Sequence, residues 1–162
     1  MTGFCAIDIR HLYFHIPFCP KLCPYCSFYV ETGAQNKTTA FLDALLREVE
    51  DAGQRFALRP QTIYFGGGTP SALTGEQLEY LLGGLRARLD LSELTEWTFE
   101  VNPATVRAEK ARLLKSAGVT RISLGVQSFQ PEILKTLMRF KTHQKLLLKF
   151  KILLLLHLKV LP

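Results

Sequence analysis

Two patterns of apolar residues alternate along residues 12–137 of the chain: short continuous runs, and segments with helical spacing. Short runs rich in apolar and aromatic residues, which are typical of strands, lie at 12–18, 62–68, 97–103 and 121–129. Each run is followed by a segment in which apolar residues recur at helical spacing, as Leu42, Leu45, Leu46 and Val49 do. Four successive strand–helix pairs predict an α/β fold with a parallel sheet and right-handed crossovers.

Capping residues mark the expected ends of the helices. Thr74 and Gln77 have the spacing of a capping box, and a leucine-rich helical segment follows them. Thr105 is expected to cap the third helix, which is expected to stop at Gly118. Pro131 suits the first turn of the fourth helix. Each expected strand is therefore followed by a helix with its own start signal or apolar stripe.

Residues that could bind a metal or a ligand follow the expected strands. Cysteines come after the first strand and a glycine run ends the second, while Glu100 lies near the end of the third and Gln127 near the end of the fourth. Ligands of parallel α/β folds bind at the carboxyl ends of the strands. We therefore expect one site that is built by four consecutive strand ends.

Three cysteines lie within eight positions of the segment HIPFCPKLCPYCSF (15–28), with the spacing C-x3-C-x2-C. They are Cys19, Cys23 and Cys26. Thiolates are the usual ligands of cubane iron–sulfur clusters, and a loop of this spacing suits such a cluster. Three protein thiolates leave one iron of the cubane without a protein ligand, so a small molecule has a place to bind and react.

A structural zinc site is the alternative for this segment, with His15 as the fourth ligand of a Cys3His set. His15 lies within an expected strand, however, and zinc sites usually pair two short ligand arms. The start of the chain lacks the pattern of a secretory signal, which predicts a cytoplasmic protein and disfavours a disulfide framework. Cys5 is interpreted as a buried or incidental thiol.

The net charge of +6 is confined to the end of the chain. Residues 1–132 hold 13 Lys and Arg against 14 Asp and Glu, whereas residues 133–162 hold seven Lys and Arg and no acid. Because no basic stripe runs through the main body, the charge does not indicate nucleic-acid binding.

Four segments in order carry a resemblance to a known family: YFHIPFCPKLCPYC, YFGGGTPS, FEVNP and SLGVQSF. Together they resemble the radical S-adenosylmethionine (SAM) superfamily, and within it the oxygen-independent coproporphyrinogen III oxidase and its relative, the HemW-type heme chaperone. The resemblance covers about residues 12–139. It implies the first four β-α units of a partial radical-SAM (β/α) barrel, with a [4Fe–4S] cluster on Cys19, Cys23 and Cys26 and with SAM on the fourth iron.

The resemblance also implies a set of SAM contacts. Tyr13 contacts SAM from the first strand, Tyr25 packs beside the cluster, and Glu100 accepts hydrogen bonds from the ribose hydroxyls. Gln127 contacts SAM from the fourth strand, and Arg139, which lies where the sequence departs from the family pattern, meets the SAM carboxylate. The glycine segment that approaches the methionine end of SAM consists of Gly67, Gly68 and Thr69.

One position separates the two branches of the family. The oxidase carries a further cysteine two residues after the third, where this chain has Phe28. The chain therefore resembles the heme chaperone more closely, with heme or porphyrin and heme-accepting client proteins as the implied partners. The alternative is an oxidase that decarboxylates coproporphyrinogen III to protoporphyrinogen IX.

The amino-acid composition changes near residue 139. Residues 140–162 form an atypical tail that is rich in Leu and Lys. Its longest run without a charged residue or histidine is Ile152–Leu156, far short of the roughly 20 apolar residues of a membrane span. A basic amphipathic surface helix is one interpretation. Our hypothesis is a truncated or frame-shifted end that does not continue the fold, which would leave the fourth strand as an edge unless the tail covers it.

Overall fold

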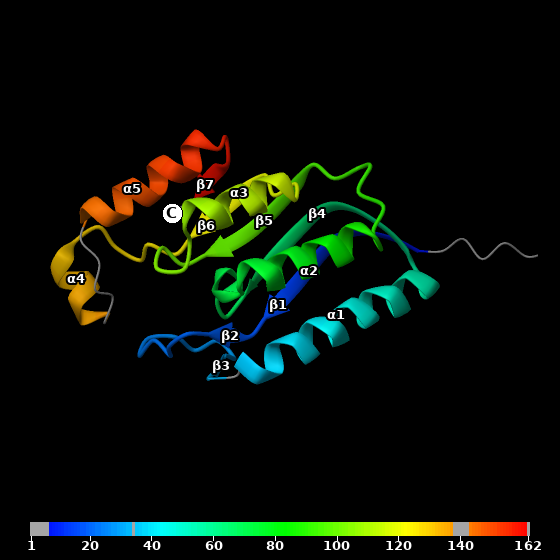
Figure 1. Cartoon of the computed structure of the whole chain (residues 1–162), viewed down its shortest axis with the longest axis horizontal. Helices are drawn as coiled ribbons and strands as arrows, with labels where there is room; N and C mark the ends of the chain where they lie inside the picture. Colours follow the sequence, from blue (N-terminus) through cyan, green and yellow to red (C-terminus); the bar gives the residue numbers. More distant parts are fainter. Residues whose placement is uncertain (1–6, 34, 138–142, 162) are drawn as a thin grey trace, which may run out of the picture.

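The computed structural model describes residues 7–33, 35–137 and 143–161. A five-stranded sheet runs through it, with all neighbouring strands parallel and in the order β1-β4-β5-β6-β7 (Figure 1). Strand order follows chain order, as in a (β/α) barrel, so the predicted partial barrel is confirmed. The strands are β1 (Asp8–Ile16), β4 (Ala57–Gly67), β5 (Glu96–Val101), β6 (Arg121–Leu124) and β7 (Lys159–Leu161).

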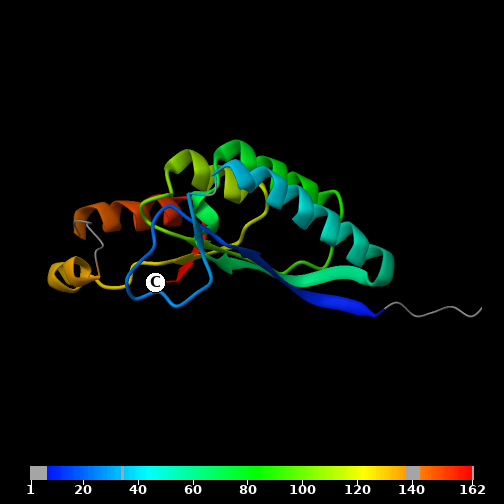
Figure 2. The same cartoon turned by 90° about the horizontal axis from the view of Figure 1, so that it is seen from below.

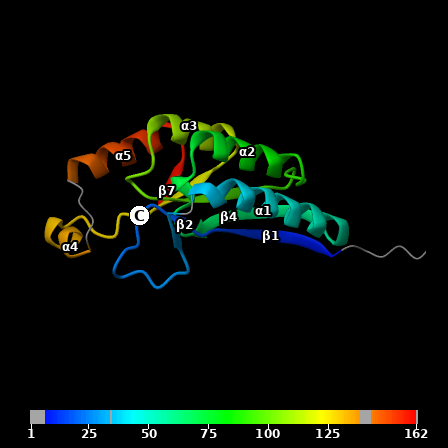
Figure 3. The same ribbon diagram turned by 60° about the horizontal axis from the view of Figure 1, so that its bottom comes forward.

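Four longer helices connect these strands and lie over one face of the sheet (Figure 2 and Figure 3). They are α1 (Gln35–Arg55), α2 (Gly75–Arg86), α3 (Ala108–Ser116) and α5 (His143–Leu155). Shorter elements lie at the carboxyl ends of the strands, where they shape the loops. They are β2 (Phe18–Cys19), β3 (Glu31–Thr32), the 3-10 turn η1 (Pro70–Ala72) and α4 (Pro131–Thr136).

The two faces of the sheet differ in polarity because successive strand residues point to opposite sides. Beneath the helices, the ring of Phe65 stacks on Phe14 with centroids 4.8 Å apart and on Phe99 at 5.1 Å. Trp97 is fully buried beside them. The other face carries a polar set, whose members from β1 to β6 are His11, Tyr13, His15, Thr62, Tyr64, Glu96, Thr98, Glu100, Arg121 and Ser123.

The helical predictions are largely confirmed. In α1 the side chains of Leu42, Leu46 and Val49 are buried, as their spacing indicated. Thr74 and Gln77 form the predicted capping box, in which each side chain accepts from the backbone N–H of the other residue. Pro131 occupies the first turn of α4, and Gly118, with φ +105°, follows the end of α3.

The prediction that Thr105 caps the third helix is wrong. The helix starts at Ala108 with Arg107 at its N-cap position and without a side-chain cap. The hydroxyl of Thr105 donates instead to the carbonyl of Asn102, 3.0 Å away, in the loop that leaves β5. Thr105 is therefore used by the loop and not by the helix.

Strands end earlier than their apolar runs predicted. The fourth strand was expected over 121–129, but β6 ends at Leu124, where a tight turn brings the N–H of Val126 to within 2.7 Å of the Leu124 carbonyl. The first run is interrupted by Pro17, which has no N–H for a ladder, so that β1 ends at Ile16 and the chain resumes as β2. Apolar content alone does not reveal these breaks: Phe18 stays buried after β1, whereas Phe129 beyond β6 is exposed.

The described part of the tail continues the fold, whereas the truncated or frame-shifted origin of the tail stays a hypothesis. After α5 the chain returns as β7, which pairs in parallel with β6, so β6 is covered and is not an edge strand. Leu153 and Leu158 are buried in the common core, and the N–H of Lys159 donates to the carbonyl of Thr120. The described part of the tail thus completes the fourth helical crossover of the sheet, from β6 to β7.

The outward side of α5 carries exposed leucines together with the exposed side chain of Lys151. The exposed leucines are Leu147, Leu148, Leu154 and Leu155. The helix spans 13 residues. Within the described parts of the chain, no helix combines the length and the hydropathy that a bilayer crossing requires.

Two adjacent leucines of α5 test whether the tail packs on the sheet. Leu153 is fully buried and Leu154 is 59% exposed. We expect Leu153→Ala to lower the free energy of unfolding by about 2–5 kcal/mol, because it leaves a cavity in the core. Leu154→Ala should change it by less than about 0.5 kcal/mol. Urea unfolding followed by circular dichroism measures both, and equal effects of the two substitutions would show that α5 is not docked.

Candidate functional site

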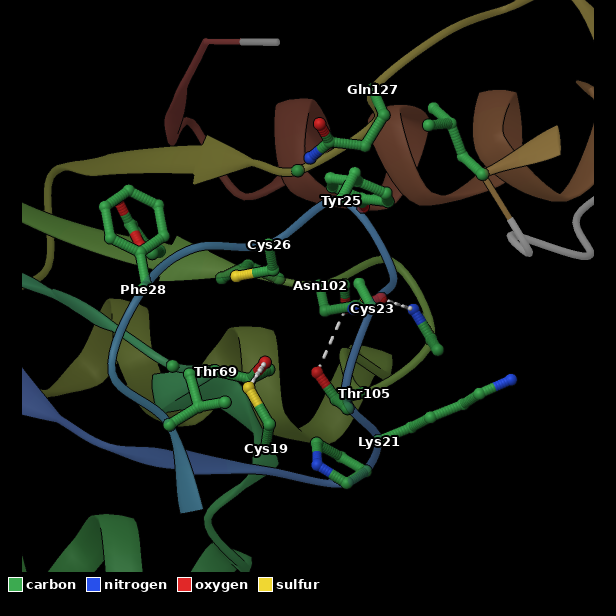
Figure 4. A pocket seen from close by; sticks show the side chains of 18 of the residues that line it. Cys19, Lys21, Cys23, Tyr25, Cys26, Phe28, Thr69, Asn102, Thr105 and Gln127 are labelled. Atoms are coloured by element: carbon green, nitrogen blue, oxygen red, sulfur yellow. Dashed lines mark hydrogen bonds between the residues drawn. The ribbon is translucent and has the colours of Figure 1, made fainter. Parts of the chain in front are cut away.

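The carboxyl ends of the strands surround a cavity of about 1010 Å³ (Figure 4). The loop between β2 and β3 forms one wall, and the end of β4 with the turn after it forms another. The ends of β5 and β6 and the loop before α4 complete the lining. The sequence-predicted residues that line this cavity are Cys19, Cys23, Tyr25, Cys26, Gly67, Gly68, Thr69, Glu100 and Gln127.

The three clustered cysteines all face this cavity from one loop (Figure 4). Cys19 ends β2, and the N–H of Cys26 donates to the carbonyl of Cys23 at 3.0 Å, which closes the C-x2-C step into a turn. The side chains are partly exposed. The Sγ of Cys19 lies 3.2 Å from the hydroxyl of Thr69, so the loop is linked to the turn that follows β4.

The three cysteines line the cavity, whereas His15 is not among the described lining residues. His15, the fourth ligand of the zinc alternative, packs its ring against Gly67, and its Nε2 is buried without a hydrogen-bond partner. A cubane distributes three thiolates over three irons, so its ligands surround a larger volume, as the cysteines around this cavity do.

The glycine segment abuts the preceding strand of its own chain. Gly67 has φ +102°, and a Cβ there would lie 2.7 Å from the ring of His15. A Cβ at Gly68 would lie 2.7 Å from the carbonyl oxygen of Pro17, while the N–H of Gly68 donates to the carbonyl of Ile16 at 2.8 Å. Any larger residue would therefore push the segment away from β1. These contacts position the turn whether or not a ligand also approaches it.

A buried polar network that the sequence did not predict ties this turn to the loop after β5. The hydroxyl of Ser71 accepts from the N–H of Asn102 at 2.9 Å and lies 2.6 Å from the hydroxyl of Thr105. The Nζ of Lys110 donates to the carbonyls of Ser71 and Leu73, at 2.8 and 2.6 Å. Burial lowers the pKa of Lys110. Asn102 and Ser71 gave a signal in advance, as parts of the FEVNP and YFGGGTPS segments.

Glu100 lines the cavity and has a partner on the neighbouring strand. The hydroxyl of Tyr64 donates to its Oε1 at 2.7 Å, which stabilises a half-buried carboxylate. Burial, followed by the hydrogen bond and the charge of Glu100, raises the pKa of Tyr64 to about 12. Tyr13 stacks on Tyr64, and burial together with the charge of Glu100 raises its pKa as well. Tyr13 itself is not among the described residues that line the cavity.

Gln127 adopts a backbone conformation that is uncommon for its residue type. Its φ is +71°, in the left-handed region that favours glycine. Strain of this kind clusters at ligand sites, where surrounding structure maintains it. Gln127 and Tyr25 line the same cavity (Figure 4). Arg139 and Cys5 lie outside the described residues, so the structure does not place either of them.

Comparisons with known proteins agree on one family. The model of the radical SAM superfamily matches residues 13–160. The heme chaperone HemW of Lactococcus lactis subsp. lactis is 42% identical over 131 residues, which are 80% of this chain and 34% of that protein. HemW of Escherichia coli K12 is also 42% identical, over 83% of this chain and 36% of that protein. The chain thus spans about a third of the length of these relatives.

Among solved structures, the coproporphyrinogen III oxidase HemN from Escherichia coli, a radical SAM enzyme, superposes with a TM-score of 0.81 at 29% identity. The match covers 91% of this chain and 34% of the oxidase. The fold of this chain therefore reproduces about a third of that enzyme.

The three clustered cysteines should be necessary for iron binding. Anaerobic reconstitution is expected to give about four irons per chain, the stoichiometry of a cubane. Cys19→Ala, Cys23→Ala and Cys26→Ala should each abolish the brown chromophore, and the matched control Cys5→Ala should retain it. Iron and acid-labile sulfide analysis provides the measurement. One zinc per chain without sulfide, or loss of the chromophore in Cys5→Ala, would contradict this assignment.

Proposed function

This chain belongs to the radical SAM superfamily, and from this membership we propose that it holds a [4Fe–4S] cluster and binds SAM in the strand-end cavity. The observation that carries the proposal is the shared lining: three cysteines, a glycine segment and a carboxylate come from three separate strand ends to one cavity. A volume of about 1010 Å³ is at the upper end of the size of ligand pockets, which suits a cluster together with a nucleoside.

The chain's own residues have distinct roles in this proposal. Cys19, Cys23 and Cys26 ligate three irons and leave the fourth open. When bound, the cluster supplies the electron that cleaves SAM reductively, which is cofactor chemistry that the protein positions and shields. The hydroxyl of Thr69 lies 3.2 Å from the Sγ of Cys19 and can donate to that thiolate. Such hydrogen bonds to sulfur are one of the means by which proteins adjust the cluster potential.

SAM would lie between the cysteine loop and the ends of β4, β5 and β6. Glu100 accepts from the ribose hydroxyls, since a carboxylate offers several lone pairs to a vicinal diol. Gly67, Gly68 and Thr69 provide backbone groups near the methionine end, and Gln127 contacts the ligand from the opposite side. Tyr25 packs beside the cluster. Tyr13 contacts SAM from the polar face of β1. The contact of Arg139 with the SAM carboxylate remains a prediction from the family pattern.

The role that we favour is that of a heme chaperone-like protein in heme or porphyrin metabolism. The support is the identity of 42% to two proteins named HemW, and the presence of Phe28, 70% exposed, where the oxidase pattern has a fourth cysteine. Heme or porphyrin and heme-accepting client proteins are the proposed partners. A cytoplasmic location remains a prediction.

A coproporphyrinogen III oxidase is the second candidate, because the fold match to that enzyme has a TM-score of 0.81. The two roles differ in their products. Anaerobic incubation with SAM, a reductant and coproporphyrinogen III should leave the porphyrinogen unchanged if the chain is chaperone-like. Loss of two carboxyl groups, detected by mass spectrometry, would support the oxidase instead.

Glu100 is the residue whose substitution tests SAM binding. Glu100→Ala removes hydrogen bonds to a charged group, which typically contribute roughly 1.5–3 kcal/mol. We therefore expect the SAM affinity to fall about ten- to a hundred-fold while the iron content stays unchanged. Equilibrium dialysis of the reconstituted protein measures the SAM affinity, and iron analysis measures the iron content.

Glu96 provides the matched control for this experiment. It lies on the same strand and the same face but pairs with Arg121, and it is not among the cavity-lining residues that the structure describes. Glu96→Ala should leave the affinity for SAM unaltered. If Glu100→Ala binds SAM as tightly as the unaltered protein does, Glu100 is a surface carboxylate without a role in ligand binding.

A further inference from the structure

Tyr64 lies on the polar face of the sheet, one strand away from Glu100. The register pairs Tyr64 with Tyr13 on β1 and with Thr98 on β5. Glu100 is two residues beyond Thr98 on the same face, so the side chain of Tyr64 reaches it diagonally across the ladder. The phenol donates to Oε1 of Glu100 at 2.7 Å, and burial together with this carboxylate raises its pKa to about 12.

The ring of Tyr64 is held in this position from two sides. Tyr13 stacks on it with ring centroids 6.0 Å apart and an interplanar angle of 23°. Gly66 leaves the space into which both side chains lean, since a Cβ there would lie 3.0 Å from the Tyr64 ring and 3.1 Å from the Tyr13 hydroxyl. The hydroxyl of Tyr13 is in turn 3.3 Å from Nδ1 of His15. A row of contacting side chains therefore crosses β1 and β4 and ends at Glu100.

Tyr64 and Glu100 have different relations to the cavity. Glu100 lines it, whereas Tyr64 is not among the described lining residues. Tyr64 therefore lies behind the carboxylate as seen from the cavity. It occupies one oxygen of Glu100, and no other hydrogen bond to this carboxylate is found in the described part of the chain. One oxygen is thus fixed by the protein, and the second has capacity for a ligand.

We propose that Tyr64 is a positioning residue, whose hydroxyl fixes the orientation in which Glu100 accepts hydrogen bonds from the vicinal hydroxyls of the ligand ribose. The inference rests on the proposed SAM site. A carboxylate that is free to rotate loses entropy when a diol binds to it, whereas a carboxylate held by a partly buried donor has already lost part of that freedom. Tyr64 acts through Glu100 and does not touch the ligand.

Tyr64→Phe removes the donor and keeps the ring and its stack on Tyr13. Tyr80→Phe is the matched control, because Tyr80 on α2 makes the same kind of bond, a phenol to the carboxylate of Asp43 at 2.6 Å, away from the cavity. The probes are S-adenosylhomocysteine and its 2′-deoxy analogue, bound to the reconstituted protein and measured by equilibrium dialysis. Iron content and melting temperature are recorded for each variant.

The unaltered chain should bind the ribose ligand more tightly than the 2′-deoxy ligand. Tyr64→Phe should weaken the ribose ligand about three- to ten-fold, less than Glu100→Ala does, because the carboxylate remains. It should weaken the deoxy ligand less than the ribose ligand, because the deoxy ligand offers Glu100 one hydroxyl in place of two. In the Glu100→Ala background, Tyr64→Phe should cause no further loss, because the two residues act as one unit. Tyr80→Phe should change neither affinity.

Three results would overturn the inference, and they separate it from the proposed function. If Tyr64→Phe weakens both ligands equally, its role is structural. If Glu100→Ala weakens the ribose ligand but Tyr64→Phe does not, Glu100 binds ribose without help from Tyr64, and only the positioning role fails. If neither substitution has an effect, or the unaltered chain binds no ligand, the proposed SAM site fails and the inference fails with it.

Discussion

The position of every functional residue in this chain depends on the register of its parallel sheet. Phe65 sets that register, because its ring is stacked between Phe14 of β1 and Phe99 of β5 in a fully buried layer under the helices. A slip of one residue would turn a strand's whole apolar set toward the polar face. Each buried aromatic side chain contributes about 1.5–3 kcal/mol, so exposing several of them would cost an amount comparable to the whole stability of a typical domain.

The same register assembles the site. It aligns Tyr13 with Tyr64 on the polar face and brings the ends of β1, β4, β5 and β6 to one side of the sheet. Contacts within the chain then fix the loops: Gly68 abuts the carbonyl of Pro17, and Ser71 joins the turn after β4 to Asn102 after β5. The cavity is therefore formed largely by backbone packing, and the cysteine loop covers one side of it.

The sequence predicted the parts of this structure that local pattern determines. Helical spacing located α1 and α2, and the cysteine, glycine and FEVNP segments identified most of the cavity lining. The sequence did not predict the pairing of the last strand. β7 is three residues long, and nothing in a leucine–lysine segment indicates that it pairs with β6. Tyr64 was likewise read only as part of a strand, since its bond to Glu100 joins residues 36 positions apart. Thr105 was misassigned because a loop and a helix N-terminus use the same hydroxyl chemistry.

The central claim is that the three cysteines leave one iron open and that SAM binds to it. Electron paramagnetic resonance of the reduced, reconstituted chain tests this most directly, with spectra recorded before and after SAM is added. Binding to the open iron changes the ligand field of the cluster, so the account predicts a shift of the g values in the presence of SAM. A [4Fe–4S] signal that saturating SAM leaves unchanged would contradict it.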